Sequence, residues 1–284
     1  MKRLVKLFIG LAVAGMDLLL AVGAKLVGRQ PRSRCVVLYY HAVPATQRSR
    51  FLAQMEILCK HATPIRAGHQ APLKPGRRYA AVTFDDAFLS VIENALPELE
   101  KRRIPATIFV PTGSLGQAPR WIKNGSAAAK HETVLSPEAL KQLSGNPLLE
   151  FGSHTISHPH LPTLEPAQAQ AELCDSKATL ESLLSKSVTL FSFPHGEYNE
   201  ALVRQAREYG YTRIFTIAPC LALQQPNEFV TGRVLADPSD WSLEFWLKLV
   251  GAYRWLALLR PTRPLNTSSA ARVQGPEGAM AQTS

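Results

Sequence analysis

From residue 35 to residue 259, short apolar runs alternate with stretches in which apolar positions recur at helical spacing. The runs are four to six residues long and rich in Val, Ile, Phe and Tyr, which predicts strands. The strand candidates are Val36–Tyr40, Ala80–Phe84, Ala106–Val110, Leu148–Gly152, Leu190–Phe193, Thr212–Ile217 and Val230–Leu235. Helices are expected between them at about 51–60, 88–102, 137–144, 165–184, 199–209 and 241–259. This alternation predicts an α/β domain over 35–259 with a parallel sheet, closed as a barrel or open.

Residues 1–30 are mostly apolar and precede this alternation. A basic start followed by an apolar run of ten residues is compatible with a signal peptide. A transmembrane anchor of about 18 residues fits as well, although Asp17 near its middle is costly there. A third interpretation is a helix in the membrane interface, because five charged side chains share an arc of about 140° on a helical projection: Arg3, Lys6, Asp17, Lys25 and Arg29. A fourth is an ordinary helix packed on the domain. We expect this segment to associate with membrane lipid.

The C-terminal part of the chain contains two further segments of unusual composition. Residues 241–259 are apolar around nearly the whole helix and include three of the four tryptophans. A core helix and a helix that contacts lipid both explain that pattern. Residues 260–284 are rich in Pro, Ser, Ala and Gly without periodicity, which predicts a disordered tail.

Composition narrows the function classes. The 284 residues are 46% hydrophobic and carry a net charge of +10. Residues 1–34 hold seven Lys/Arg and one Asp, and residues 260–284 hold three Arg and one Glu, so the domain between them is nearly neutral. A nucleic-acid partner is therefore not expected, because such a partner requires a basic face on the domain itself. The four cysteines have no zinc-finger or CxxC spacing.

Ionisable residues follow four of the predicted strands. They are His41, Asp85 with Asp86, His154 with His158, and His195. The carboxyl ends of parallel strands meet at one edge of a sheet, where α/β proteins build their active sites. The sequence therefore predicts that these side chains form one site.

The spacing of His154 and His158 indicates a metal site. On a helical turn, imidazoles four residues apart point to one side, as a divalent metal requires. Together with one carboxylate they make three ligands and leave a coordination position open, which is typical of catalytic rather than structural zinc. A second aspartate could then accept the proton of a bound water.

Five ordered segments resemble the polysaccharide deacetylases, the NodB-like carbohydrate esterases. They are Leu38–His41, Thr83–Asp86, Ile104–Val110, Ser153–Pro159 and Phe191–Asn199. The family has the fold of a distorted (β/α) barrel, so the resemblance implies that fold for this chain. It also implies hydrolysis of the N-acetyl group of an N-acetylated sugar in a poly- or oligosaccharide, with release of acetate.

The resemblance implies a role for each residue of the predicted site. The ligands of one divalent metal ion, expected to be zinc, would be Asp86, His154 and His158. Asp85 would be the general base that deprotonates the attacking water. The metal and a backbone N–H near His195 would stabilise the oxyanion.

The remaining roles depend on departures from the family pattern. The arginine that usually orients the base is absent, and its position resembles Ser192; Arg233 is the candidate replacement. His41 would protonate the leaving amine, as a histidine at the first strand end does in one branch of the family. Pro194 and Tyr198 are assigned supporting roles in the site.

Two other function classes stay open. The fold also hosts hydrolases of non-sugar amides, and a catalytically inactive carbohydrate-binding module would keep the same architecture. A glycan substrate and a membrane-associated N-terminal segment together predict a place at the cell envelope or on the extracytoplasmic face of a membrane.

Overall fold

The computed structural model describes residues 3–122, 132–225 and 227–259, so the predicted disordered tail at 260–284 lies outside the described residues. Nine strands form one sheet whose strand pairs are all parallel. Their order is β8-β7-β6-β5-β4-β3-β1-β9, and β2 pairs with β3. The strands are β1 (Arg34–Tyr40), β2 (Thr63–Pro64), β3 (Arg78–Phe84), β4 (Ala106–Val110), β5 (Leu149–Ser153), β6 (Leu190–Ser192), β7 (Arg213–Phe215), β8 (Val230–Thr231) and β9 (Val234–Leu235).

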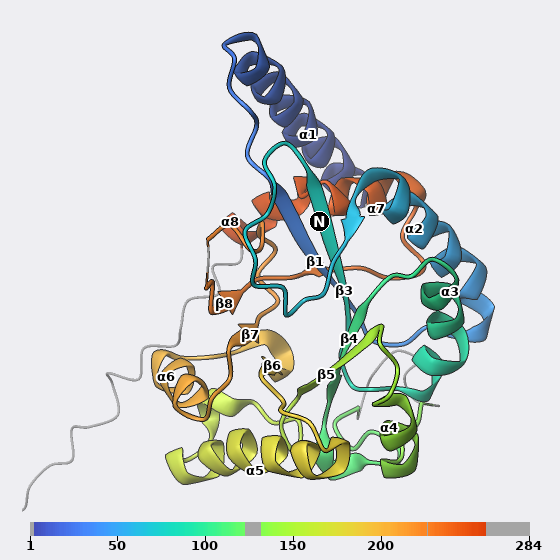
Figure 1. Cartoon of the computed structure of the whole chain (residues 1–284), viewed down its shortest axis with the longest axis vertical. Coiled ribbons are helices and arrows are strands. Elements are labelled where there is room, and N and C mark those ends of the chain that lie inside the picture. The colour runs from blue at the N-terminus through green and yellow to red at the C-terminus, as the bar shows by residue number, and fades with distance from the viewer. Residues whose placement is uncertain (1–2, 123–131, 226, 260–284) are drawn as a thin grey trace, which may run out of the picture.

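The two edges of the curled sheet are joined by a two-residue corner. The predicted strand over 230–235 divides into β8 and β9, which lie at opposite ends of the sheet although only Gly232 and Arg233 separate them. A Cβ on Gly232 would lie 2.2 Å from the carbonyl oxygen of Ala218 and 2.4 Å from Sγ of Cys220, so this corner requires glycine. The distorted α/β barrel predicted from the sequence is confirmed (Figure 1).

Helices cover the outside of the sheet (Figure 1). Two of them begin where the sequence predicts, because the Ser136 hydroxyl accepts a hydrogen bond from the Ala139 N–H and the Asn199 side chain accepts one from the Leu202 N–H. The helices are α1 (Arg3–Leu26), α2 (Arg48–His61), α3 (Leu96–Lys101), α4 (Pro137–Leu143), α5 (Pro166–Leu184), α6 (Glu200–Glu208), α7 (Ser242–Leu249) and α8 (Leu256–Leu259).

Two predicted helices are interrupted in the structure. The helix expected at 88–102 is a π-helical turn (Val91–Ala95) followed by α3, and Pro97 cannot donate the hydrogen bond that a continuous α-helix needs. The helix expected at 241–259 breaks after α7 at Gly251, whose φ of 76° is left-handed. A 3-10 turn (Ala252–Trp255) and α8 follow. The single helix over 241–259 was therefore a wrong prediction.

Helix α1 packs on α7 and the following turn with only one of its faces. Leu7 and Gly10 are buried there, and a Cβ on Gly10 would lie 3.2 Å from both Leu247 and Tyr253. Asp17 is only 7% exposed, because its carboxylate pairs with Arg254 at 2.7 Å and with Arg34 at 2.5 Å. Arg3 and Asp17 of the predicted polar arc thus face the domain, whereas Lys25 is exposed and Arg29 lies beyond the end of α1.

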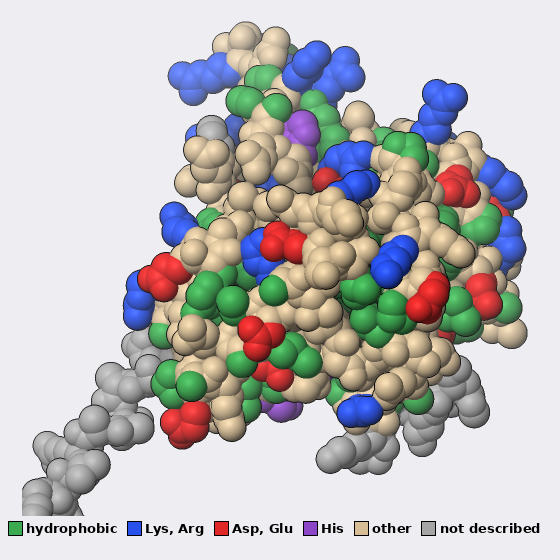
Figure 2. Space-filling model, turned by 60° about the horizontal axis from the view of Figure 1, so that its bottom comes forward, with side chains coloured by type: hydrophobic (Ala, Val, Ile, Leu, Met, Phe, Trp, Pro, Cys, Tyr) green, Lys and Arg blue, Asp and Glu red, His purple; other side chains and the backbone are tan. Residues whose placement is uncertain are grey.

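The opposite face of α1 carries a row of exposed apolar side chains: Leu4, Val5, Phe8, Leu11, Met16, Leu18, Leu19, Leu20, Val22 and Leu26. By length and composition, α1 is the one helix in the described part of the chain that could cross a membrane. Figure 2 shows basic side chains at the protruding end of α1, whereas acidic and basic side chains are interspersed on the rest of that face.

Candidate active site

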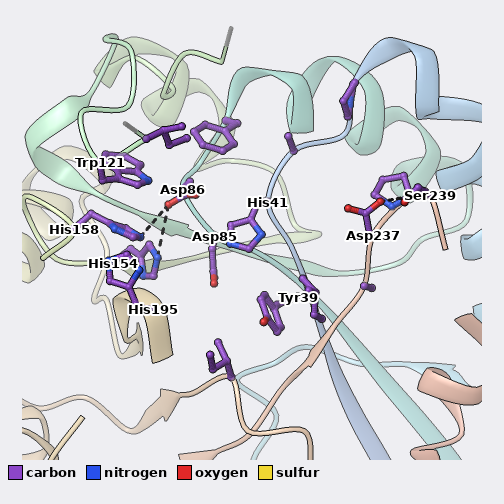
Figure 3. A pocket seen from close by; sticks show the side chains of 18 of the residues that line it. Tyr39, His41, Asp85, Asp86, Trp121, His154, His158, His195, Asp237 and Ser239 are labelled. Carbon is purple, nitrogen blue, oxygen red and sulfur yellow. Dashed lines mark hydrogen bonds and ion pairs between the residues drawn. The ribbon is translucent and has the colours of Figure 1, made fainter. Parts of the chain in front are cut away.

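The carboxyl ends of the strands surround a pocket of about 520 Å³. All six ionisable residues that the sequence places at strand ends line it: His41, Asp85, Asp86, His154, His158 and His195. Figure 3 shows Asp86 facing His154 and His158, with Asp85 and His41 beside them. The fold thus brings together residues that are up to 154 positions apart in the chain.

Three of these side chains have potential metal-ligand atoms that converge on one point. The Asp86 Oδ1 atom lies 3.4 Å from Nε2 of His158 and 3.8 Å from Nε2 of His154. Within the described residues, the ligand atoms of these three side chains form a group that lies within 4.8 Å of one another. Tetrahedral zinc with bonds of about 2.0 Å separates its ligand atoms by roughly 3.3 Å, so small shifts would complete such a site.

The chemistry of the donor atoms also fits a metal. Burial, followed by the charges of neighbouring histidines, lowers the pKa of His158 to about 2, and burial lowers the pKa of His154 to about 4, so both rings are neutral. The Nδ1 atom of His154 lies 2.7 Å from the Ser192 carbonyl oxygen, which can only accept, so Nε2 is the free lone pair. Asp86 Oδ1 is buried without a hydrogen-bond partner among the residues described. Burial and then the charge of Asp85 raise the pKa of Asp86. A bound cation would offset the free-energy cost of ionising this buried carboxyl group.

The loop that carries the two histidines differs from the prediction. His154 and His158 do not lie on a helical turn, because Thr155 and His158 both have left-handed φ angles of 69° and 59°. The rings still meet, with centroids 4.8 Å apart. Glu172 on α5 holds this loop by accepting hydrogen bonds from the backbone N–H groups of Ile156 at 2.7 Å and Ser157 at 3.0 Å. No sequence signal distinguishes Glu172 from an ordinary exposed helix residue.

Asp85 is bound by the arginine at the barrel corner. The two terminal nitrogens of Arg233 donate to the two carboxylate oxygens at 2.7 and 2.8 Å, and one of them also donates to Ser192 Oγ at 2.7 Å. Both partners are fully enclosed, with 0% of the Arg233 side chain exposed. Burial alone would raise the pKa of Asp85, but the Arg233 guanidinium outweighs it and lowers that pKa to about 2. Asp85 is therefore ionised at neutral pH and fixed in orientation.

His41 lines the pocket from the end of β1. The surrounding protein lowers its pKa, against the opposing effect of the Asp85 charge. The ring is therefore a neutral imidazole at neutral pH, able to accept a proton before it donates one.

Aromatic rings surround His158 on the pocket wall. Trp121 stacks on the His158 ring with centroids 4.7 Å apart, and His195 contacts the other side of that ring at 4.7 Å. His195 in turn stacks on His160, whose Nδ1 lies 2.8 Å from the Glu197 carboxylate. His160 and Glu197 were not identified from the sequence, because nothing in their spacing marks them.

The two remaining supporting residues do not line the pocket. Pro194 is buried in the turn that carries His195, and this turn gives His195 a left-handed φ of 58°. Tyr198 stacks on Phe193 with ring centroids 5.4 Å apart. Their contacts are therefore with the scaffold beneath the site rather than with a bound molecule.

Solved structures share this architecture. The structure of IcaB from Ammonifex degensii matches with a TM-score of 0.63 and 24% identity, over 78% of this chain and 99% of that chain. The Streptococcus pyogenes deacetylase PplD in complex with acetate matches with a TM-score of 0.61 and 22% identity, over 76% of this chain and 98% of that chain. At these identities the likeness establishes the fold.

Sequence comparison identifies the family. YxkH of Bacillus subtilis (strain 168), a protein assigned to the polysaccharide deacetylases, is 28% identical over 213 residues, covering 71% of each chain. The poly-beta-1,6-N-acetyl-D-glucosamine N-deacetylase of Staphylococcus aureus (strain MSSA476) is 26% identical over 180 residues, covering 61% of this chain and 58% of that enzyme. The family model of the polysaccharide deacetylases matches residues 73–214, which is half of this chain. The chain therefore belongs to the polysaccharide deacetylase family.

Proposed function

We propose that this protein is a metal-dependent N-deacetylase that hydrolyses the N-acetyl group of a sugar in a poly- or oligosaccharide. The observation that carries the proposal is the convergence of Asp86, His154 and His158, with neutral imidazoles and an unpartnered carboxylate oxygen, beside an ionised second carboxylate. The staphylococcal relative deacetylates an N-acetylglucosamine polymer, as its name states, which supports the substrate class.

The residues of the pocket would divide the reaction among them. A divalent ion, with zinc as the best match to two imidazoles and a carboxylate, supplies Lewis-acid activation of the acetamide carbonyl and of water when bound. Asp85, held by Arg233, is the general base: it accepts a hydrogen bond from the attacking water and takes its proton. The backbone N–H near His195 donates to the oxyanion.

The leaving amine needs a proton, and His41 is the group assigned to deliver it. The lowered pKa of His41 favours its neutral form before turnover, so His41 can take up a proton that originates in the attacking water. Water then adds to the acetamide carbon, the C–N bond breaks, and acetate and the free amine are the products. His41 would thus close the proton cycle between water and amine.

Acetate release with and without metal tests this proposal. The protein is treated with a chelator, dialysed, and assayed on N-acetylglucosamine oligomers and peptidoglycan fragments with and without added zinc. We expect zinc to restore acetate release in the wild type and in His160→Ala, a control for a nearby exposed histidine, but not in His158→Ala. Acetate release that is insensitive to the chelator, or hydrolysis of cyclic amides only, would contradict the proposal.

We also propose that α1 lies in the membrane interface and holds the enzyme at the cell envelope. Arg3 and Asp17 of its polar arc are used in docking to the domain, so most of its exposed face is apolar. Basic residues near both ends of α1 favour anionic lipid head groups. Flotation with anionic vesicles tests this: the full-length protein should float, and Leu19→Glu on the exposed face should float less. Equal recovery of both proteins in the soluble fraction would refute it.

A further inference from the structure

A second groove lies beside the catalytic pocket and shares part of its wall. Tyr39, Ile217 and Leu235 line both, so these three side chains form the boundary between the two spaces. Figure 3 shows Tyr39 on the far side of Asp85 from Trp121, away from the three ligand side chains. The groove has a volume of about 430 Å³, within the range that holds one small molecule.

Most of the groove wall is apolar. Pro219, Val234, Leu256 and Leu259 contribute to it, and they come from the barrel corner and from α8. Leu259 is itself exposed, so the groove is open towards solvent along α8. A hydrocarbon chain bound there would remove the apolar wall from water, which is energetically favourable.

One part of the groove is polar and carries unused hydrogen-bonding capacity. Tyr253 is only 2% exposed, and its buried hydroxyl has no hydrogen-bond partner among the described residues. Lys6 on α1 lines the same groove and forms no ion pair within the part of the chain that the structure describes. An unsatisfied donor beside a free cation is typical of a site for an anion.

The charges around this part of the groove leave an excess of one positive charge. Glu244 also lines the groove, and it pairs with Arg3 at 2.6 Å and with Lys248 at 3.8 Å. Lys248 in addition pairs with Asp240 at 2.6 Å. The three cations Arg3, Lys6 and Lys248 therefore exceed the two acids by one, and Lys6 carries the uncompensated charge.

Helix α1 borders both spaces. Besides its contact with Glu244, the Arg3 guanidinium donates to the carbonyl oxygen of Ser239 at 3.0 Å, and Ser239 lines the catalytic pocket. The first turn of the proposed membrane helix thus lies where the groove and the catalytic pocket meet.

From these features, and resting on the proposed function, we infer that the substrate is a lipid-linked saccharide whose lipid phosphate occupies the groove. The hydrocarbon chain would lie on the apolar wall, and the phosphate would accept hydrogen bonds from Lys6 and the Tyr253 hydroxyl. The N-acetylated sugar at the other end of the molecule would pass Tyr39 and enter the catalytic pocket. The wall that the groove shares with that pocket favours a substrate over an ordinary membrane phospholipid.

Binding of farnesyl phosphate, a soluble single-chain lipid phosphate, tests the groove without catalysis. Calorimetric titration of the full chain should show binding that neither farnesol nor inorganic phosphate reproduces. Lys6→Gln and Tyr253→Phe should each weaken it roughly tenfold, because each removes a hydrogen bond to a charged group. Lys25→Gln at the other end of α1 and Tyr209→Phe on α6 are matched controls that should bind as the wild type does. No binding, or equal losses in variants and controls, would overturn the inference.

Turnover then separates the inference from the proposed function. We expect a higher kcat/KM for farnesyl phospho-N-acetylglucosamine than for methyl N-acetylglucosaminide, with the preference lost in Lys6→Gln and Tyr253→Phe and the rate on the methyl glycoside unchanged. Equal kcat/KM for the two substrates overturns the inference and leaves the deacetylase proposal intact. Tighter binding of dihexanoyl phosphatidylglycerol, without that preference, would make the groove a phospholipid site and also overturn it. If neither substrate releases acetate, the proposed function fails while the titration still decides the groove.

Discussion

Replacement of Arg233 by Met removes the only guanidinium that contacts the buried Asp85 in the described structure. The variant keeps the bulk of the side chain but deletes both hydrogen bonds to the carboxylate, which remains almost fully enclosed. An uncompensated buried charge costs about 3–5 kcal/mol. Arg233 outweighs burial and lowers the pKa of Asp85 from 3.8 to about 2, which corresponds to about 2 kcal/mol in favour of the ionised carboxylate in the folded protein, since a tenfold change in acidity corresponds to about 1.4 kcal/mol.

Guanidinium unfolding in the presence of a chelator measures this loss without a contribution from metal. In the wild-type background, we expect Arg233→Met to lower the free energy of unfolding by about 3–5 kcal/mol. In an Asp85→Asn background the same replacement leaves no charge unpaired, so the loss should be smaller by about 2 kcal/mol. Arg213→Met is the matched control, because the buried Arg213 donates only to carbonyl oxygens of Ala67, His69 and Glu228. Its loss should be the same in both backgrounds. Equal losses for Arg233→Met in both backgrounds would refute the electrostatic coupling.

Three further predictions follow from single contacts. Asp17→Asn should reduce the free energy of unfolding by about 1–3 kcal/mol in urea at neutral pH. Because its ion pairs lower the pKa of Asp17, the difference from wild type should persist above pH 4 and disappear as the pH falls through the lowered pKa. A difference that stays constant with pH would contradict this. Gly232→Ala should unfold at a much lower denaturant concentration than the wild type, whereas Gly15→Ala, where a Cβ meets nothing within 4 Å, should not. His41→Gln should keep its zinc and lose acetate release by about 10²–10⁴-fold, and a smaller loss would assign the acid to another group.

The location of the site could be predicted from the sequence because ionisable residues follow four of the seven apolar runs. His41 after β1 and Asp85 after β3 needed only the rule that parallel strands place their carboxyl ends on one edge. The loop of His154 and His158 was predicted with the wrong backbone, since left-handed angles at non-glycine residues leave no trace in a hydrophobic pattern.

Contacts across long stretches of chain were beyond prediction. The sequence suggested Arg233 only as a substitute for a missing arginine, because the apolar run over 230–235 has the pattern of one continuous strand rather than two edges of a sheet. The sequence indicated that Asp17 would be costly in a membrane. It did not reveal the partner of Asp17, Arg254, because the two residues are 237 positions apart. Pairing over that distance is decided by packing, which also turned Arg3 and Asp17 of α1 towards the domain.

The zinc content of two neighbouring aspartate variants tests the central claim most directly. Asp86→Asn replaces the carboxylate of the ligand group with a neutral, more weakly binding amide, whereas Asp85→Asn leaves all three ligand side chains in place. After dialysis against zinc and removal of the excess, Asp85→Asn should retain about one zinc ion per chain and release almost no acetate. Asp86→Asn should lose most of the zinc. Equal zinc content in the two variants would contradict the division of the aspartates into ligand and base.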